Sequence, residues 1–154
     1  MPKQPSREGL ELSQTQRTLP IALLRAREAV MDYFRPLLAE HDVTEQQWRV
    51  MRVLDEEGTV DASFLARQAC ILAPSLTRIM RTLEARGFVE INRDTADGRR
   101  TLVSLSKEGG QFIRKLAPAS AEIYQDIESK IGSERMRTLL DEIEILLESL
   151  SSES

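Results

Sequence analysis

The chain has 154 residues, of which 41% are apolar and 30% are charged, and its formal net charge is −4. This length and composition predict one folded domain with its own core and exclude a disordered chain. No apolar run approaches the roughly 20 residues of a membrane span, and no secretion signal opens the sequence. We therefore expect a cytoplasmic protein without a membrane partner.

Few residues are suited to catalysis or to metal binding. The chain has one histidine and one cysteine, and it lacks a metal-ligand cluster, a phosphate-binding glycine loop and a nucleophile elbow. A single cysteine also excludes an internal disulfide. The sequence thus argues against an enzyme and predicts no metal and no cofactor.

Charge is unevenly distributed along the chain. Residues 72–100 carry six arginines against four acidic residues, a local net charge of +2 in a chain that is acidic overall. The acidic total gives no bulk attraction to nucleic acid, but a local basic patch is compatible with phosphate binding at one place. The alternative is an ordinary solvated surface.

The first expected element is a helix within residues 13–43. Apolar residues recur there at helical spacing, and Pro36 is expected to kink the far end. Residues 1–12 are polar, as is the tail at residues 151–154, and we expect both to be disordered.

Two further helices follow at the start of a helix-turn-helix. The segment "TEQQ" from Thr44 favours a capping box, in which a hydroxyl and a glutamine amide satisfy each other's backbone N–H groups. Gly58 ends this helix, and the next residues favour an extended step. Asp61 is then the expected N-cap of a short helix, "ASFLARQA".

A fourth helix is expected to begin at Pro74 and to end at Gly87 in a left-handed conformation. A narrow apolar stripe at i, i+3, i+4 and i+7 marks its inner face, namely Leu76, Ile79, Met80 and Leu83. The exposed face offers short hydroxyl donors for phosphates and arginine forks for guanine edges. Its candidate DNA-binding residues are Pro74, Ser75, Thr77, Arg78 and Arg81.

Two strands follow, "FVEIN" and "TLVSLS", in which apolar and polar residues alternate. The seven residues between them, "RDTADGR" (93–99), include an Asp-Gly turn signal. Two strands with a basic tip after a helix-turn-helix make a wing. At that tip Arg99 is positioned to enter a narrow minor groove, with Asp97 as its orienting acceptor and Arg100 at the DNA backbone. The alternative is an ordinary charged turn.

Residues 107–150 complete the chain with further helices. Ser106 is the expected cap of the first of them, Pro118 should bend or interrupt it, and Ser133 is the expected cap of the last. Their apolar faces exceed what one small domain can cover, which predicts a homodimer built from both ends of the chain. The predicted fold is mainly α with a small β-wing: a winged helix-turn-helix at 44–106 between N- and C-terminal dimerisation helices.

The order of elements and the segment "DGRRTLVSLSKEG" resemble the MarR family of bacterial transcription regulators. Asp97 and Arg99 match the family's D-x-R pattern at the wing. Leu105, Ser106 and Gly109 match its L-T-x-x-G pattern, with serine in place of threonine. Further stretches, "LPIALLRARE", "HDVTEQQWRVMRVL", "CILAPSLTRIMRTLEARG" and "IYQDIESKIG", resemble the subgroup that regulates homoprotocatechuate degradation operons.

This resemblance implies a homodimeric repressor on a pseudo-palindromic site in double-stranded DNA. The fourth helix would enter the major groove and the wing the adjacent minor groove. A small aromatic acid would bind between the dimerisation helices and the DNA-binding lobe and release the operator. A carboxylate needs a cation and a phenol ring needs apolar walls. The candidate effector-binding residues are Arg17, Arg25, His41, Trp48 and Arg49.

Two alternatives remain open at this stage. Some members of the family sense peroxide through a cysteine, usually in the first helix. Here the sole cysteine, Cys70, lies between the third and fourth helices beside apolar Ile71 and Leu72, and we expect it to be buried and inert. The second alternative is a winged-helix module that binds another protein, which the acidic composition favours.

Overall fold

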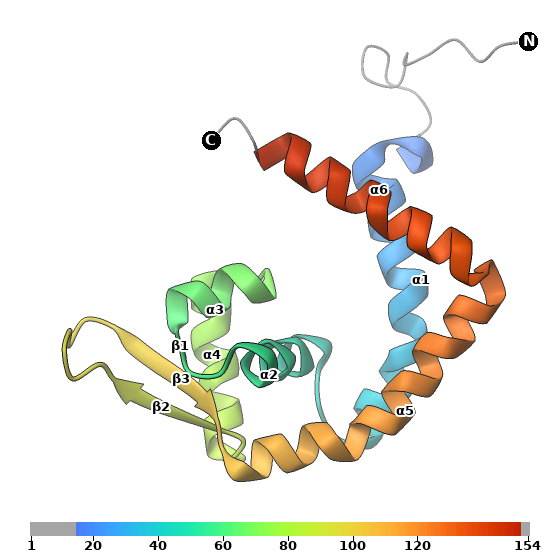
Figure 1. Ribbon diagram of the computed structural model, residues 1–154. Helices are drawn as coiled ribbons and strands as arrows, with labels where there is room; N and C mark the ends of the chain where they lie inside the picture. Colours follow the sequence, from blue (N-terminus) through green and yellow to red (C-terminus); the bar gives the residue numbers. More distant parts are fainter. Residues whose placement is uncertain (1–14, 152–154) are drawn as a thin grey trace, which may run out of the picture. The chain divides into compact units, whose positions relative to one another are not determined.

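The computed structural model describes residues 15–151, and the chain divides into two compact units, one up to Pro36 and one from Leu37 onward (Figure 1). Most of the described chain is helical, as the sequence predicted. The elements are η2 (Thr15–Arg17, a 3₁₀ helix), α1 (Leu19–Glu40), α2 (Glu45–Glu57), β1 (Val60–Asp61), α3 (Ala62–Ala69), α4 (Ala73–Ala85), β2 (Val89–Arg93), β3 (Thr101–Leu105), α5 (Lys107–Ile131) and α6 (Ser133–Ser151).

The sequence predicted disorder at residues 1–12 and in the tail at residues 151–154. Residues 1–12 and 152–154 lie outside the described residues. Ser151, which the sequence placed in a disordered tail, is instead the last residue of α6. The apolar spacing of this helix continues to Leu150, so the helix runs to the end of that pattern.

The predicted N-caps of α2 and α3 are confirmed. The Thr44 hydroxyl accepts a hydrogen bond from the Gln47 N–H at 3.1 Å, and the Gln47 amide oxygen accepts one from the Thr44 N–H at 3.0 Å. One Asp61 carboxylate oxygen accepts from the Phe64 N–H at 2.8 Å. Each bond satisfies a donor that the first turn of a helix cannot pair internally.

The other predicted helix boundaries agree to within a residue. Pro74 is the second residue of α4 rather than the first, and Gly87 follows the helix with a φ of +80°. Ser133 is itself the first residue of α6. Pro36 and Pro118 both lie inside helices that continue through them. Figure 1 shows α5 changing direction along its length, as a proline inside a helix predicts.

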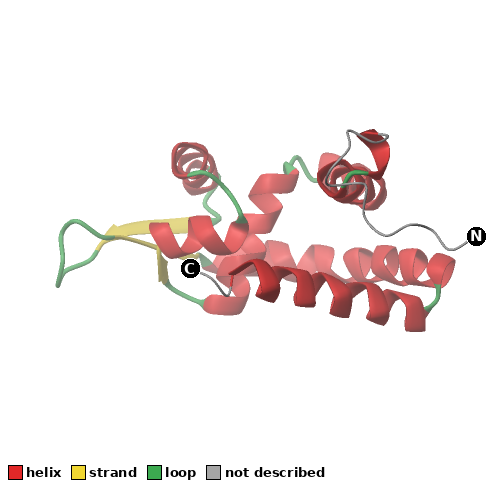
Figure 2. Cartoon of the chain, turned by 90° about the horizontal axis from the view of Figure 1, so that it is seen from above, coloured by secondary structure: helices red, strands yellow, loops and turns green. Residues whose placement is uncertain are grey.

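The sheet is antiparallel with the strand order β1-β3-β2. In the wing, Val89 pairs with Leu105 and Arg93 pairs with Thr101, so the two long strands are in register to the base of the tip. The extended step predicted after Gly58 is the short strand β1, which pairs with β3. This pairing attaches the wing to the start of α3. The strands are confined to the wing, whose tip extends away from the helices (Figure 2).

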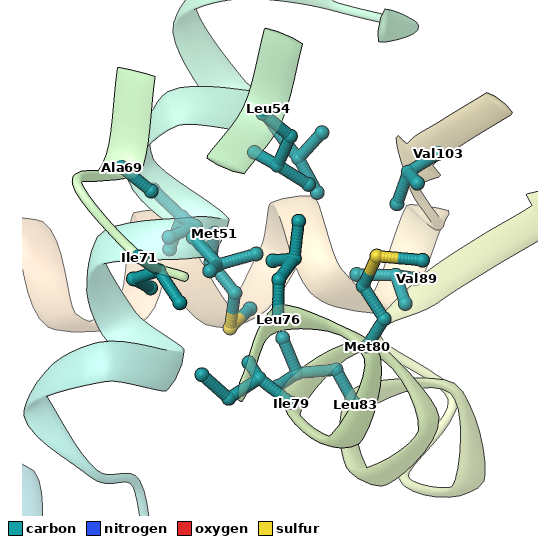
Figure 3. Packing of buried hydrophobic residues seen from close by; sticks show 13 residues of the cluster. Met51, Leu54, Ala69, Ile71, Leu76, Ile79, Met80, Leu83, Val89 and Val103 are labelled. Carbon is teal, nitrogen blue, oxygen red and sulfur yellow. The ribbon is translucent and has the colours of Figure 1, made fainter. Parts of the chain in front are cut away.

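The core of the second unit lies between α2, α3, α4 and the sheet (Figure 3). The predicted inner stripe of α4 is confirmed, because Leu76, Ile79, Met80 and Leu83 are each buried. Burying one such side chain contributes about 1.5–3 kcal/mol to folding. The stripe therefore fixes the rotation of α4 about its axis and leaves the opposite face exposed.

None of the helices in residues 15–151 combines the length and the apolar character that crossing a bilayer requires. Within the same residues, histidine, cysteine, aspartate and glutamate side chains do not gather into a group able to hold a metal ion.

Candidate nucleic-acid interface

The exposed face of α4 carries most of the side chains that the sequence singled out. Thr77, Arg78 and Arg81 are exposed, as is Pro74, whereas Ser75 is half-buried. The Thr77 hydroxyl donates its hydrogen to the Ala73 carbonyl at 3.1 Å. In this orientation the hydroxyl oxygen can only accept a hydrogen bond from a further partner. The two arginines form no ion pair within the described part of the chain.

The wing tip is held by a set of local hydrogen bonds. The Ala96 N–H donates to the Asp94 carboxylate at 2.9 Å, and the Arg93 guanidinium donates to the Gly98 carbonyl at 2.8 Å. The Arg100 N–H donates to the Asp97 carbonyl at 3.0 Å, which closes a turn. These bonds fix the backbone of the tip without using the Arg99 side chain.

Arg99 is almost fully exposed at the tip of the wing. Its side chain is 95% exposed, and its Nε lies 3.6 Å from Asp97 Oδ1. The same carboxylate oxygen accepts a hydrogen bond from the Arg99 N–H at 3.0 Å. Asp97 therefore contacts both the backbone and the side chain of Arg99. A guanidinium presented in this way can enter a narrow groove lined by phosphates.

Arg100 lies at the base of the tip and contacts two carboxylates. Its guanidinium is 3.1 Å from Asp61 and 3.4 Å from Asp94. The Phe64 N–H and then Arg100 hold the pKa of Asp61 below its usual range. Asp61 thus caps α3 and anchors the wing with one carboxylate. The sequence assigned Arg100 to the DNA backbone, and it gave no sign of this bracing contact.

A groove separates α4 from the wing, and its lining includes the apolar side chains of Met80 and Ile91 and the carboxylate of Glu84. Arg81 lies on the helix side and Arg93 on the strand side. The exposed face of α4 and the arginine-bearing wing thus belong to one continuous surface of the second unit. That surface carries hydroxyl and guanidinium groups, which are the kinds of group that contact phosphates and base edges in protein–DNA complexes.

The comparisons with known proteins agree with this geometry. The model of the MarR family matches residues 43–101, the segment that carries the helix-turn-helix, the strand β2 and the tip of the wing. The homoprotocatechuate degradative operon repressor of Escherichia coli is 43% identical over 122 residues, which are 79% of this chain and 82% of the relative. The chain belongs to the MarR family.

Two other MarR proteins extend the comparison. The HTH-type transcriptional regulator FarR of Neisseria gonorrhoeae is 43% identical over 124 residues, covering 80% of this chain and 85% of the relative. The crystal structure of NadR in complex with 4-hydroxyphenylacetate superposes with a TM-score of 0.81 at 38% identity, covering 88% of this chain and 99% of NadR. The protein is therefore a MarR-type DNA-binding regulator, and this membership places it outside the enzymes, as the sequence predicted.

The candidate effector-binding residues fall in both units. Arg17 lies in η2 and Arg25 in α1, and both are exposed within the first unit. His41 and Trp48 belong to the second unit, where their rings lie edge-on to Phe112 with centroid distances of 6.2 and 6.4 Å. The convergence of all five residues on one ligand stays a prediction.

Arg49 completes the candidate effector set and has an unusual environment. It is half-buried on α2, and its Nε atom is buried without a hydrogen-bond partner in the described part of the chain. A buried N–H donor that lacks a partner costs about 1–3 kcal/mol. The guanidinium of Arg49 therefore has hydrogen-bonding capacity that an acidic ligand can use.

The expectation that Cys70 is buried was wrong. The thiol is exposed, because Cys70 follows α3 with a left-handed backbone (φ 54°) that carries its side chain away from the core. Its neighbour Ile71 is buried, whereas Leu72 is exposed. A redox role for Cys70 stays the alternative that the sequence left open.

Proposed function

We propose that the protein is a homodimeric repressor of an operon for aromatic-acid catabolism and that a small phenolic carboxylate releases it from DNA. The arginine face of α4 beside the exposed Arg99 of the wing carries the DNA-binding half of this proposal. The names of two relatives support the other half, since one represses a homoprotocatechuate operon and another was crystallised with 4-hydroxyphenylacetate.

In this proposal α4 enters the major groove and the wing enters the adjacent minor groove. Arg78 and Arg81 read base edges, and Pro74, Ser75 and Thr77 lie against the backbone or the bases at the start of the helix. Arg99 enters the minor groove while Asp97 orients it. Arg100 braces the wing and lies at the DNA backbone. A symmetric dimer repeats these contacts on a pseudo-palindromic operator.

Unpartnered apolar side chains on the outer helices support the dimer. α6 has no buried residue in the described chain, yet it exposes five large apolar side chains, namely Leu139, Leu140, Ile145, Leu147 and Leu150. α1 exposes Leu19, Leu23, Leu24 and Val30. Monomeric proteins rarely expose contiguous apolar patches of this kind, and a second copy of the chain would cover them.

The effector half of the proposal depends on an aromatic junction, which is formed by the rings of His41, Trp48 and Phe112. The rings of His41 and Trp48 provide apolar walls beside Phe112, and the unpartnered Nε of Arg49 provides a donor for a carboxylate. Arg17 of η2 and Arg25 of α1 are proposed to add positive charge. A phenolic carboxylate fits this combination of an apolar wall and cationic donors.

A combined titration tests the proposal. Trp48 is the only tryptophan of the chain, so its fluorescence reports on this junction without competing signals. Adding 3,4-dihydroxyphenylacetate or 4-hydroxyphenylacetate should give a saturable change and, over the same concentration range, release a labelled operator duplex. If no aromatic acid of this class changes either signal, the effector assignment is wrong. Phenylalanine as a control ligand should have no effect.

A further inference from the structure

A second cleft lies between the base of the wing and α3. Residues from the end of β1, from α3 and from the β3 end of the tip line it, namely Asp61, Ala62, Ser63, Arg67, Arg99, Arg100 and Thr101. It shares Ala62 and Thr101 with the groove between α4 and the wing. The two hollows therefore adjoin at the base of the wing.

The residues that line the cleft include three arginines and one carboxylate, so its lining is positively charged. Both oxygens of Asp61 are engaged, one by the Phe64 N–H at 2.8 Å and the other by Arg100 at 3.1 Å. Asp94 adds a second carboxylate to Arg100 at 3.4 Å. Arg100 thus forms two ion pairs, whereas Arg67 forms none within the described residues and attracts Asp61 at longer range.

Arg67 carries the positive charge of α3 in this cleft. It is exposed in the last turn of α3, and within the described chain no carboxylate forms an ion pair with it. Ser63 is also exposed and precedes Arg67 by four residues, so the two side chains lie on one face of the helix. That face lines the cleft, where it supplies one guanidinium and one hydroxyl.

We propose that this cleft binds one backbone phosphate of the DNA beside the minor groove that the wing enters. Arg67 is its charged contact and Ser63 its hydroxyl donor. Arginine forks and serine hydroxyls are the groups that hold phosphate oxygens in protein–DNA complexes. The inference rests on the proposed DNA-binding function and adds two residues of α3 to it. The sequence alone did not single out either residue.

The test measures affinity as a function of salt. Arg67→Gln should weaken binding about fivefold, equally for the operator and for an unrelated duplex of the same length, and should lower the slope of log K against log salt by about 0.9. Ser63→Ala should give a smaller loss without changing the slope. Arg114→Gln makes the same charge change on α5, outside the cleft, and should leave the slope unchanged. Circular dichroism verifies that each variant is folded.

A methylphosphonate scan locates the phosphate. Replacing the contacted phosphate with the uncharged analogue should weaken the wild type but not Arg67→Gln. If Arg67→Gln matches the wild type in affinity and slope while Arg99→Ala does not, the cleft is not a DNA contact and the proposed function stands. If the wild type binds no duplex, the proposed function fails and this inference fails with it.

Discussion

Arg86 at the end of α4 donates a hydrogen bond to the backbone carbonyl of His41, 45 residues earlier in the chain, at 3.3 Å. Its other terminal nitrogen donates to the Asp42 carbonyl, and the guanidinium lies 4.9 Å from the centre of the Phe88 ring. The turn after α1 is thereby attached to the end of the helix proposed to read DNA. Phe88 in turn packs on Phe112, with ring centroids 4.7 Å apart.

Replacing Arg86 should therefore lower the stability of the fold. Arg86→Ala leaves two carbonyl groups without their donor, and we expect it to reduce the free energy of unfolding by about 1.5–3 kcal/mol. Arg86→Lys retains the charge but not the paired geometry, so it should recover only part of that loss. Urea unfolding followed by Trp48 fluorescence measures the effect. A midpoint equal to the wild type for Arg86→Ala would show that these bonds contribute nothing.

Two adjacent glycines at the start of α5 provide a matched pair of substitutions. A Cβ added to Gly109 would lie 2.1 Å from the Phe88 carbonyl oxygen, whereas one added to Gly110 would meet only the end of the Arg114 side chain at 3.3 Å. Gly109→Ala should destabilise the protein by about 1–3 kcal/mol or more, because the backbone must shift. Gly110→Ala should be neutral or stabilising by up to about 1 kcal/mol. Thermal unfolding of both variants tests this difference, and equal melting temperatures would contradict it.

The lowered pKa of Asp61 predicts how stability depends on pH. The folded state binds the ionised carboxylate through the Phe64 N–H and Arg100. The resulting contribution to folding stability is fully present above the ordinary aspartate pKa of about 3.9, and it is lost as pH falls through the lower pKa that Asp61 has in the folded state. Asp61→Asn can still cap α3 but cannot pair with Arg100. The wild type should be the more stable at pH 7, and the difference should shrink below about pH 4. A difference that does not change with pH would contradict this role.

The wing arginine gives a prediction for DNA affinity. Arg99→Ala should weaken operator binding at least about tenfold, because the guanidinium reaches a groove in which phosphate potential is concentrated. Its side chain is 95% exposed, so the substitution should leave the unfolding midpoint unchanged. Mobility shift measures the affinity, with Arg114→Ala as a charge-matched control on α5. Unchanged affinity for Arg99→Ala would remove this residue from the interface.

Local rules in the sequence predicted the elements of this fold well. The capping box at Thr44, the cap at Asp61 and the inner stripe of α4 depend on residues a few positions apart, and periodicity reveals them. The links between Arg86 and His41 and between Arg100 and Asp61 join residues 45 and 39 positions apart. Surface arginines have no pattern that identifies such partners.

The same limit applies to the candidate site. Cys70 is exposed because it adopts a left-handed backbone at the end of α3. Its apolar neighbours in the sequence had instead predicted that it is buried. The two arginines of α4 could be assigned to an exposed face because the opposite stripe is apolar. Arg67 lines a cleft only because β1 pairs with β3 and brings the wing to α3, a contact that no local motif encodes.

The salt dependence of binding to an operator duplex tests the central claim most directly. Titrations of the full chain against the promoter region of its neighbouring genes, and against an unrelated duplex, should be made between about 50 and 200 mM salt. The account predicts that operator affinity falls steeply over this range, by about 10³-fold or more if six or more phosphates are contacted, and exceeds affinity for the unrelated duplex throughout. An affinity that depends on neither the salt concentration nor the DNA sequence would contradict it and would favour a winged-helix module that binds another protein.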